Sequence, residues 1–276
     1  MNLSPRFFLL TAVIATAGAL TANAQVSALD NFENNNPGTA YNDGIQYGDN
    51  GGSGFGALTY LEGTGGGIFD GSLDGARALG IFASNGFGNA QALGRTTQDI
   101  FDRGTYSLEA RFDLDNSVGS SGFNIKSGLG SGAGAFGQNE ELFFGLTPGS
   151  GSGSIFVSDS TGSHTFSVGT DTELRGINLS FSVAFDTVMG TYTLTATDLG
   201  NSQTNSFTGL LKDTNGGSAG TGAIDAIAFG NFNTGGSQNL IVDDLSMVPE
   251  PSTWAMGSLS ALGLVGSAFR RFRRAA

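Results

Sequence analysis

The chain has 276 residues, no cysteine, a single histidine and a formal net charge of −12 at pH 7. The absence of cysteine excludes disulfide bonds, thiolate catalysis and sulfur-ligated metal sites, and one histidine leaves zinc without enough of its usual ligands. The acidic balance repels nucleic acid phosphates and anionic lipid, so we expect no nucleic acid partner.

Residues 1–24 have the composition of a secretory signal peptide. Arg6 is followed by an apolar run over residues 7–20 and then by small residues at Ala22 and Ala24. A positive residue, an apolar stretch and a small-x-small cleavage site in this order are typical of such a signal. We therefore expect export of the chain, with signal peptidase cleaving after Ala24.

Residues 25–248 are expected to form one domain, because no internal repeat or charged linker divides them. This region carries 7 basic and 23 acidic residues, a net charge of −16, and 42 of the chain's 46 glycines. Glycine clusters between apolar runs indicate turns and long loops. Eighteen phenylalanines are too many for a disordered chain, so the sequence predicts a folded, glycine-rich domain.

Three segments of this region alternate apolar and polar residues with a period of two, as half-buried antiparallel strands do. They are residues 105–114, 177–186 and 191–199, and the alternation places Tyr106 and Tyr192 on core-facing positions. Shorter runs of similar character lie at residues 76–82, 141–146, 154–158, 164–168, 223–232 and 239–248. Roughly ten or more short strands separated by turns predict an all-β, antiparallel β-sandwich.

The two ends of this region resemble those of concanavalin A-like jelly rolls, which occur in lectins, glycan-binding modules and some glucanases. Residues 29–34 (LDNFEN) open the domain, residues 239–248 (NLIVDDLSMV) close it, and a long amphipathic hairpin at 177–199 lies between them. The resemblance implies a β-sandwich whose first and last strands pair. It also points to sugar as a ligand.

Calcium is the most plausible metal, because carboxylates and loop carbonyls are abundant. If the first and last strands pair, Asp30 and Glu33 approach Asp243 and Asp244. Four acidic groups at one seam repel each other unless a cation or hydrogen bonds offset the repulsion. The alternative is that the four are separate surface carboxylates.

An exposed aromatic face is the usual means of binding sugar, and residues 25–248 contain no tryptophan. Tyr41, Tyr47 and Tyr60 lie in stretches rich in Gly and Asn near the start of the domain, and they are the best candidates for a stacking platform. The alternative is that these tyrosines anchor loops.

Catalytic residues are not expected. Jelly-roll glucanases carry a Glu-x-Asp-x-x-Glu run that sets two carboxylates a short distance apart, and no such run is present. Glu140 and Glu141 would point to opposite faces of a strand, as solvated edge charges. His164 is accompanied by no Gly-x-Ser-x-Gly elbow and is expected in a turn or at a strand edge. A hydrolase or lyase activity remains an alternative only because carboxylates far apart in the sequence can converge in the fold.

The C-terminus predicts one transmembrane helix. Pro249, Glu250 and Pro251 precede sixteen uncharged residues at 254–269. As a helix these would rise roughly 24 Å, a short span for a bilayer core of about 30 Å. Positive residues stay on the cytoplasmic side, which places everything before the helix outside the cytoplasm. The positive cluster consists of Arg270, Arg271, Arg273 and Arg274.

In this order, residues 249–276 resemble the PEP-CTERM sorting signal of Gram-negative bacteria. The resemblance implies recognition of Pro249, Glu250 and Pro251 by an exosortase, a membrane cysteine protease that removes the tail. Two prolines flanking one residue also fix φ and remove backbone donors, which gives an extended segment that an enzyme at the membrane surface can bind. The alternative is a C-terminal anchor that is never cut.

These features predict an exported protein that is transiently anchored in the inner membrane and then reaches the cell surface, secreted polysaccharide or biofilm. Its partners would be signal peptidase, exosortase and extracellular polysaccharide. The leading hypothesis is a non-catalytic sandwich in that matrix. The alternative is a lectin-like module with a defined glycan, with or without calcium.

We predict that mature protein lacks residues 269–276, because exosortase processing removes the helix and its arginines. An intact-mass spectrum of protein recovered from producing cells measures this directly. A mass that retains these residues would favour the uncut anchor.

Overall fold

The computed structural model describes residues 27–33, 41, 43–84, 89–114, 119–147, 153–168, 173–212, 223–233 and 238–250. Contacts divide the chain into two units, Val26–Val248 on one hand and Met1–Gln25 with Pro249–Ala276 on the other. The predicted signal peptide and transmembrane helix lie outside the described residues. Within the described part of the chain, no helix is long and apolar enough to cross a membrane.

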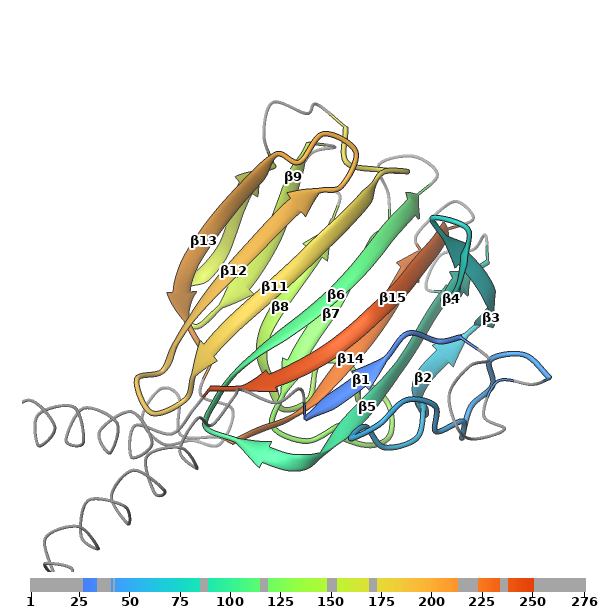
Figure 1. Ribbon diagram of the computed structural model, residues 1–276, viewed down its shortest axis with the longest axis horizontal. Coiled ribbons are helices and arrows are strands. Elements are labelled where there is room, and N and C mark those ends of the chain that lie inside the picture. The colour runs from blue at the N-terminus through green and yellow to red at the C-terminus, as the bar shows by residue number, and fades with distance from the viewer. Residues whose placement is uncertain are drawn as a thin grey trace, which may run out of the picture. The chain divides into compact units, whose positions relative to one another are not determined.

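The described residues form two antiparallel sheets stacked as layers, with β13, β12 and β11 towards one side and β3 and β2 towards the other (Figure 1). The eight-stranded sheet has the order β13-β12-β11-β6-β15-β4-β3, and β1 pairs with β15. Its strands are β1 (Ala28–Asp30), β3 (Gly66–Leu73), β4 (Ala76–Ala83), β6 (Arg103–Leu114), β11 (Asn178–Asp186), β12 (Thr191–Asp198), β13 (Thr204–Leu210) and β15 (Gln238–Pro249).

The seven-stranded sheet has the order β10-β9-β8-β7-β14-β5-β2. Gly65, at a φ of 66°, connects β2 in this sheet with β3 in the other, so the chain changes layers at one edge of the sandwich. The strands are β2 (Thr59–Thr64), β5 (Asn89–Phe101), β7 (Ser120–Lys126), β8 (Glu140–Leu146), β9 (Ser154–Asp159), β10 (Gly162–Ser167) and β14 (Ile224–Asn233).

The predicted all-β antiparallel sandwich is confirmed. The three alternating segments are β6, β11 and β12, and the shorter runs are β4, β8, β9, β10, β14 and β15. The first and last strands pair in antiparallel register, with Ala28 opposite Met247 and Asp30 opposite Leu245. Tyr106 and Tyr192 are buried, as their positions in the alternation predict.

The core between the sheets is rich in phenylalanine, and Phe123 of β7 lies at its centre. Its ring centroid is 5.2 Å from that of Phe144, 5.8 Å from Phe181, 5.9 Å from Phe229 and 6.0 Å from Phe112. These residues come from both sheets. Offset and edge-to-face contacts at such distances contribute about 0.5–1.5 kcal/mol each beyond the burial of area, so the aromatic side chains join the two layers.

The segment 127–139 covers the outer face of the seven-stranded sheet. Phe136 packs with Leu61, Ala92 and Ala228 in a second apolar cluster, separate from the main core. The buried Lys126 donates hydrogen bonds from its Nζ to the carbonyl oxygens of three residues of the segment. Most side chains of β7 and β14, and residues 91–95 of β5, are therefore buried on both faces.

This covering explains why the sequence did not reveal two of the strands, β5 and β7. Residues 120–126 (β7) and 89–101 (β5) lack clean alternation, because their outward positions pack under the segment. Period-two patterning arises only where one face of a strand meets water. Asn124, for example, is completely buried and donates to the carbonyl oxygen of Phe136 at 2.7 Å.

A buried ion pair closes the edge of the sandwich near β1. Arg95 of β5 pairs with Asp30 of β1, and both side chains are fully buried. Arg95 also donates from Nε to the carbonyl oxygen of Gly56 and from Nη2 to that of Gly51, each at 2.8 Å. Tyr41 donates its hydroxyl hydrogen to Asp30 at 2.5 Å. One guanidinium thus connects β1, β5 and the loop that precedes β2.

Glycine allows this loop to approach β1. The backbone of Ser53 exchanges two hydrogen bonds of 2.8 Å with Leu29. A Cβ on Gly52 would lie 2.1 Å from the carbonyl oxygen of Leu29, and one on Gly54 would lie 1.9 Å from that of Ser27. Both glycines also have positive φ, 76° and 73°. The glycine-rich stretch DNGGSGFG is therefore a close-packed closure of the sandwich edge.

We predict that Arg95→Met lowers the free energy of unfolding by about 3–5 kcal/mol, because it leaves the Asp30 carboxylate buried without its counter-charge. Arg103→Met is the matched control. Arg103 pairs with Asp186 at 2.9 Å near the surface, where an ion pair contributes at most about 1 kcal/mol. Chemical denaturation measures the free energy of unfolding of both variants. Equal losses of stability in the two variants would contradict the role assigned to Arg95.

Candidate functional site

Tyr47 and Tyr60 form an exposed aromatic pair at the edge of the sandwich. Tyr60 lies on β2 and Tyr47 lies in the loop before it. Their ring centroids are 5.5 Å apart, and the rings meet edge to face at 89°. The two residues are 40% and 50% exposed. The sequence predicted both as members of a stacking platform, and the structure places them side by side.

Several hydrogen bonds hold the pair in place. Gln91 of β5 donates from its amide nitrogen to the Tyr47 hydroxyl oxygen at 2.6 Å, and Tyr60 donates to the carbonyl oxygen of Gly63 at 3.1 Å. The loop carrying Tyr47 is closed by two backbone hydrogen bonds of 2.8 Å: Gly48 donates to the carbonyl oxygen of Leu58, and Leu58 donates to that of Asp49. Both rings are thus held by the sheet behind them, with their outward faces free for a ligand.

The environment keeps the Tyr47 phenol neutral. Burial of its inner part, followed by the neighbouring Tyr60, raises the pKa of Tyr47 to about 12. A neutral phenol donates and accepts hydrogen bonds while its ring presents an apolar face. The pair therefore offers two stacking surfaces and hydrogen-bonding groups at their rim.

The interpretation of Tyr41 as a third stacking residue was wrong. Tyr41 is only 1% exposed and packs at 6.0 Å from the ring of Phe32. Its hydroxyl donates a hydrogen bond to the buried Asp30 carboxylate. Burial is the main cause of the raised pKa of Tyr41. Tyr41 is an anchor for the loop, the alternative weighed for all three tyrosines.

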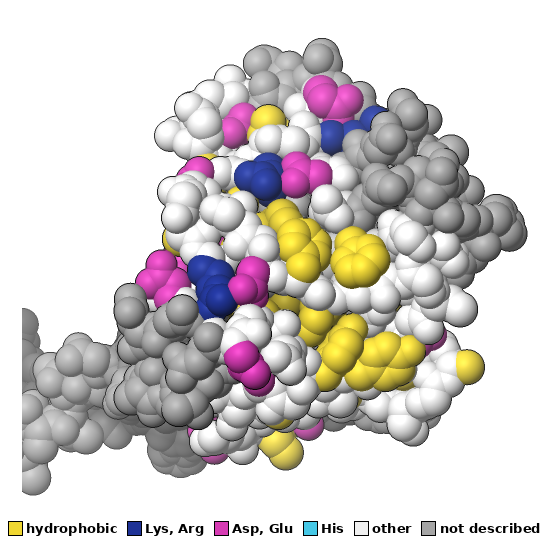
Figure 2. All heavy atoms as spheres, turned by 90° about the vertical axis from the view of Figure 1, so that its right-hand side faces the viewer, with side chains coloured by type: hydrophobic (Ala, Val, Ile, Leu, Met, Phe, Trp, Pro, Cys, Tyr) yellow, Lys and Arg dark blue, Asp and Glu magenta, His cyan; other side chains and the backbone are white. Residues whose placement is uncertain are grey.

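Further aromatic side chains lie on the strands next to the pair. Phe82 of β4 is 36% exposed, and its ring lies 6.2 Å from that of Phe69 of β3. A Cβ on Gly67 would lie 2.8 Å from the Phe82 ring, so the ring lies flat against a glycine backbone. Figure 2 looks onto this side of the molecule and shows hydrophobic side chains gathered there.

The expected calcium site does not form as the sequence suggested. Asp30 points into the interior towards Arg95, because the ion pair satisfies a carboxylate that has left water. Asp243 and Asp244 lie on β15 between the stretch that pairs with β4 and the stretch that pairs with β1. No group of three or more acidic or histidine side chains is arranged to hold a metal ion anywhere in the described ranges.

Asp243 is nevertheless in an unusual position. It is nearly buried, and burial raises the pKa of Asp243 to about 7; the like charges of Asp244, Glu109 and Glu33 add to this effect, while a hydrogen bond from the Asp244 backbone opposes it. Burial, Asp244 and Asp74 also raise the pKa of Glu109. Three of the four predicted ligands are therefore electrostatically coupled, and Asp30 is not among them.

The residues weighed for catalysis have structural partners. His164 lies on the edge strand β10, as expected, and its Nε2 is 2.8 Å from the Thr161 hydroxyl and 3.4 Å from Asp159. One ring nitrogen thus faces both groups, unlike a triad, in which the acid and the nucleophile contact opposite nitrogens. Glu140 pairs with Lys212. Glu141 is buried rather than solvated, and it accepts a hydrogen bond from Ser127 at 3.0 Å.

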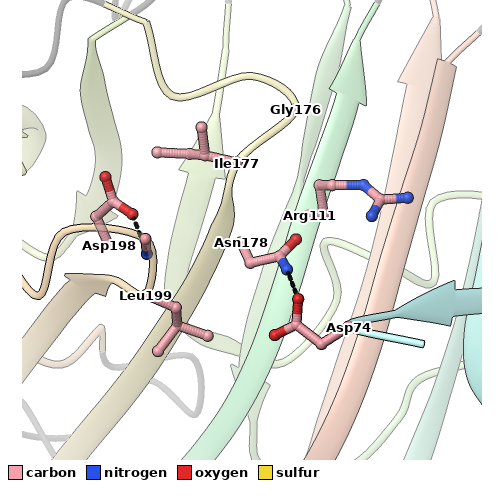
Figure 3. Close-up of a pocket in the computed structure, with 8 residues that line it drawn as sticks. Asp74, Arg111, Gly176, Ile177, Asn178, Asp198 and Leu199 are labelled. Carbon is pink, nitrogen blue, oxygen red and sulfur yellow. Dashed lines mark hydrogen bonds between the residues drawn. The ribbon is translucent and has the colours of Figure 1, made fainter. Parts of the chain in front are cut away.

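A polar pocket of about 430 Å³ lies on the outer face of the eight-stranded sheet (Figure 3). Its polar groups mostly satisfy each other: Asn178 donates to Asp74 at 2.5 Å, and Gly200 donates its backbone hydrogen to Asp198 at 2.7 Å. Figure 3 shows Asn178 and Asp74 pointing towards each other, with Arg111 directed away from them. The pocket offers a ligand fewer free groups than the tyrosine pair does.

Sequence reasoning did not find Gln91, Phe82 or the pocket residues Asp74 and Asn178. Gln91 sits in β5, which lacks alternation, and it meets Tyr47 from 44 positions away in the chain. The Asp74-Gly75 dipeptide between two strands was a usable signal, since Asp-Gly is typical of tight hairpin turns. Both residues have positive φ, 49° and 87°.

Only part of the sorting motif lies in the described residues. Pro249 is the last residue of β15, and Glu250 follows it in an exposed position. The remaining predicted residues lie outside the described ranges; they are Ala22, Ala24, Pro251, Arg270, Arg271, Arg273 and Arg274.

No family model matches the chain, and no curated protein matches it. Among solved structures it is similar to lectin II from Ulex europaeus, with a TM-score of 0.43 and 10% identity over 69% of this chain and 92% of that chain. It is also similar to a legume lectin-like domain from Entamoeba histolytica (TM-score 0.45, 12% identity, 70% and 90%). A third similar structure is the T. cruzi calreticulin globular domain (TM-score 0.45, 9% identity, 79% and 95%).

We predict that Asp243→Asn raises the free energy of unfolding at pH 8 by on the order of 2 kcal/mol and that the gain shrinks towards pH 4. The folded state holds a proton on Asp243 between about pH 4 and 7 that the unfolded state releases, so wild-type stability falls as pH rises through that window. Asparagine removes this dependence.

The matched control is Asp244→Asn, at an exposed neighbour with a positive φ of 46° that asparagine tolerates. We expect a smaller gain there. Denaturant unfolding at pH 4, 6 and 8 measures both variants, and a gain for Asp243→Asn that is independent of pH would contradict the assignment.

Proposed function

We propose that this chain is an exported, non-catalytic protein whose β-sandwich binds extracellular polysaccharide through Tyr47 and Tyr60. The observation that carries the proposal is the exposed pair itself: two tyrosine rings, 40% and 50% exposed, held edge to face at a centroid distance of 5.5 Å. Exposed rings on a rigid support are unfavourable in water unless a partner covers them. Sugar rings present C–H faces that pack on aromatic rings and hydroxyls that bond to their polar rim.

The rim of the pair supports the same ligand. The Tyr47 and Tyr60 hydroxyls are neutral groups that both donate and accept hydrogen bonds, while Gln91, which is only 2% exposed, lies behind Tyr47 and positions its hydroxyl. Polyhydroxylated ligands also donate and accept at each hydroxyl.

A non-catalytic role is supported by the partners of the carboxylates on the same elements. Glu62 of β2 accepts a hydrogen bond from the backbone of Gly134 at 2.7 Å, and Asp49 accepts one from Gln46 at 2.7 Å. Asp70 pairs with Arg77. Glycan hydrolysis needs two carboxyl groups facing one bond, whereas each of these carboxylates has a structural partner.

Export is supported by the two ends of the chain. The apolar run and small residues of 1–24 favour cleavage by signal peptidase, and residues 249–276 resemble a PEP-CTERM signal. We place the mature protein at the cell surface or within secreted polysaccharide, after transient anchoring by residues 254–269 and release by exosortase. Calcium is not needed at the tyrosine pair, which stacks without a metal.

We predict that Tyr60→Ala lowers the affinity for extracellular polysaccharide of the producing bacterium about tenfold, equivalent to about 1.4 kcal/mol. Tyr60→Phe, which keeps the ring, should retain most of the binding. Val188→Ala is the matched control, because Val188 is an apolar residue, 68% exposed, in the turn between β11 and β12 of the other sheet. Cosedimentation with the polysaccharide measures binding, and equal effects of Tyr60→Ala and Val188→Ala would refute the site.

A further inference from the structure

We infer that the polysaccharide bound at Tyr47 and Tyr60 is an uncharged one, and that polymers carrying carboxylates are excluded. The inference rests on the proposed function and concerns the chemical class of its ligand. It comes from a different observation, the placement of every positive charge in the domain.

Residues 25–248 contain seven lysines and arginines, and all seven lie in the described part of the chain. Six of them are in ion pairs with carboxylates of the same chain. The pairs are Arg77–Asp70, Arg95–Asp30, Arg103–Asp186, Arg111–Asp113, Arg175–Glu173 and Lys212–Glu140. Figure 2 agrees on the face it shows, where the lysine and arginine side chains lie beside acidic ones.

The seventh cation, Lys126, is inaccessible. Its side chain is completely buried, and its three donors go to the carbonyl oxygens of Ala135, Phe136 and Gln138. Burial lowers the pKa of Lys126 to about 8. No positive side chain of the domain is therefore left to receive a carboxylate from a ligand.

The surroundings of the tyrosine pair have the opposite sign. Asp43 and Asp49 flank Tyr47 in its loop, and Glu62 follows Tyr60 on β2. Arg77 is occupied by Asp70 and by the carbonyl oxygen of Tyr41 at 2.6 Å. Recognition of carboxylates or sulfates in proteins relies on arginine and lysine, and here a uronate would meet uncompensated repulsion.

The same holds at the polar pocket. Arg111 is the only cation lining it, and its guanidinium bonds to Asp113 from Nε at 2.9 Å and from Nη2 at 3.1 Å. Figure 3 shows this side chain directed away from Asn178 and Asp74. Neither this pocket nor the tyrosine pair thus offers an anion an unpaired cation.

A neutral ligand also fits better than a cationic one. A polycation would be attracted to the whole surface, whose net charge over residues 25–248 is −16, and such binding needs no tyrosine and weakens with salt. Stacking of an uncharged sugar ring is local and hardly sensitive to salt. Binding that depends on Tyr60 and does not change with salt concentration therefore identifies an uncharged ligand.

The test uses the full-length protein in mild detergent and the extracellular polysaccharide of the producing bacterium, separated by anion exchange into a neutral and an acidic fraction. We expect the neutral fraction to bind, with less than a twofold change in affinity between 50 and 500 mM NaCl and about a tenfold loss in Tyr60→Ala. We expect no saturable binding of the acidic fraction.

Binding of the acidic fraction that depends on Tyr60 would overturn this inference and leave the proposed function standing. Salt-sensitive binding of the neutral fraction would also overturn it. Binding of neither fraction, or binding indifferent to Tyr60→Ala, would refute the proposed function itself.

A charge-introducing variant tests the cause. Gln46 is exposed and adjacent to Tyr47, so Gln46→Lys places an exposed ammonium beside the pair. We expect Gln46→Lys to gain salt-sensitive binding of the acidic fraction while its affinity for the neutral fraction stays within twofold. Absence of any gain would show that missing positive charge is not what excludes acidic polymers, and would overturn the inference.

Discussion

The buried contact between Arg95 and Asp30 is the constraint on which the candidate site depends. A guanidinium removed from water is stable only when its donors are satisfied, and here they reach β1 and the carbonyl oxygens of Gly51 and Gly56. This arrangement fixes the loop that carries Tyr47 against β5 and β1. The same strand, β5, supplies Gln91 to the Tyr47 hydroxyl. The position of an exposed aromatic ring is thus determined by a charge pair in the interior.

Glycine and phenylalanine have different roles in stabilising a domain that has no disulfides. Phenylalanine fills the space between the sheets, with Phe123 in contact with rings from both layers. Glycine allows backbone segments to pack directly on one another, as at Gly52 and Gly54 beside β1. The resulting surface is negative, because its few cations pair with neighbouring carboxylates. The tyrosine pair exposes aromatic rings on this surface.

The segment 127–139 and Asp243 show how burial changes the chemistry of ordinary residues. Lys126 keeps a loop on the sheet through three carbonyl oxygens, and no carboxylate is needed. Asp243 is held at a break in the pairing of β15, where β4 ends and β1 begins, and its ionisation opposes folding near neutral pH. Both groups belong to the structural cost of closing a sandwich with irregular segments, and neither faces the tyrosine pair's hydrogen-bonding rim.

The sequence by itself determined the all-β class and nine of the strands, because alternation is imposed locally wherever one face of a strand meets water. The pairing of the domain's first and last strands was expected only from the resemblance to concanavalin A-like jelly rolls. The sequence also indicated Tyr47 and Tyr60. Only the tertiary structure decided that Tyr41 and Asp30 turn inward, that β5 and β7 are strands covered by another segment, and that six of the domain's seven cations pair with carboxylates while Lys126 is buried. These outcomes depend on contacts between residues far apart in the chain, such as Asp30 with Arg95, and local pattern carries no information about which distant partner a polar side chain will meet.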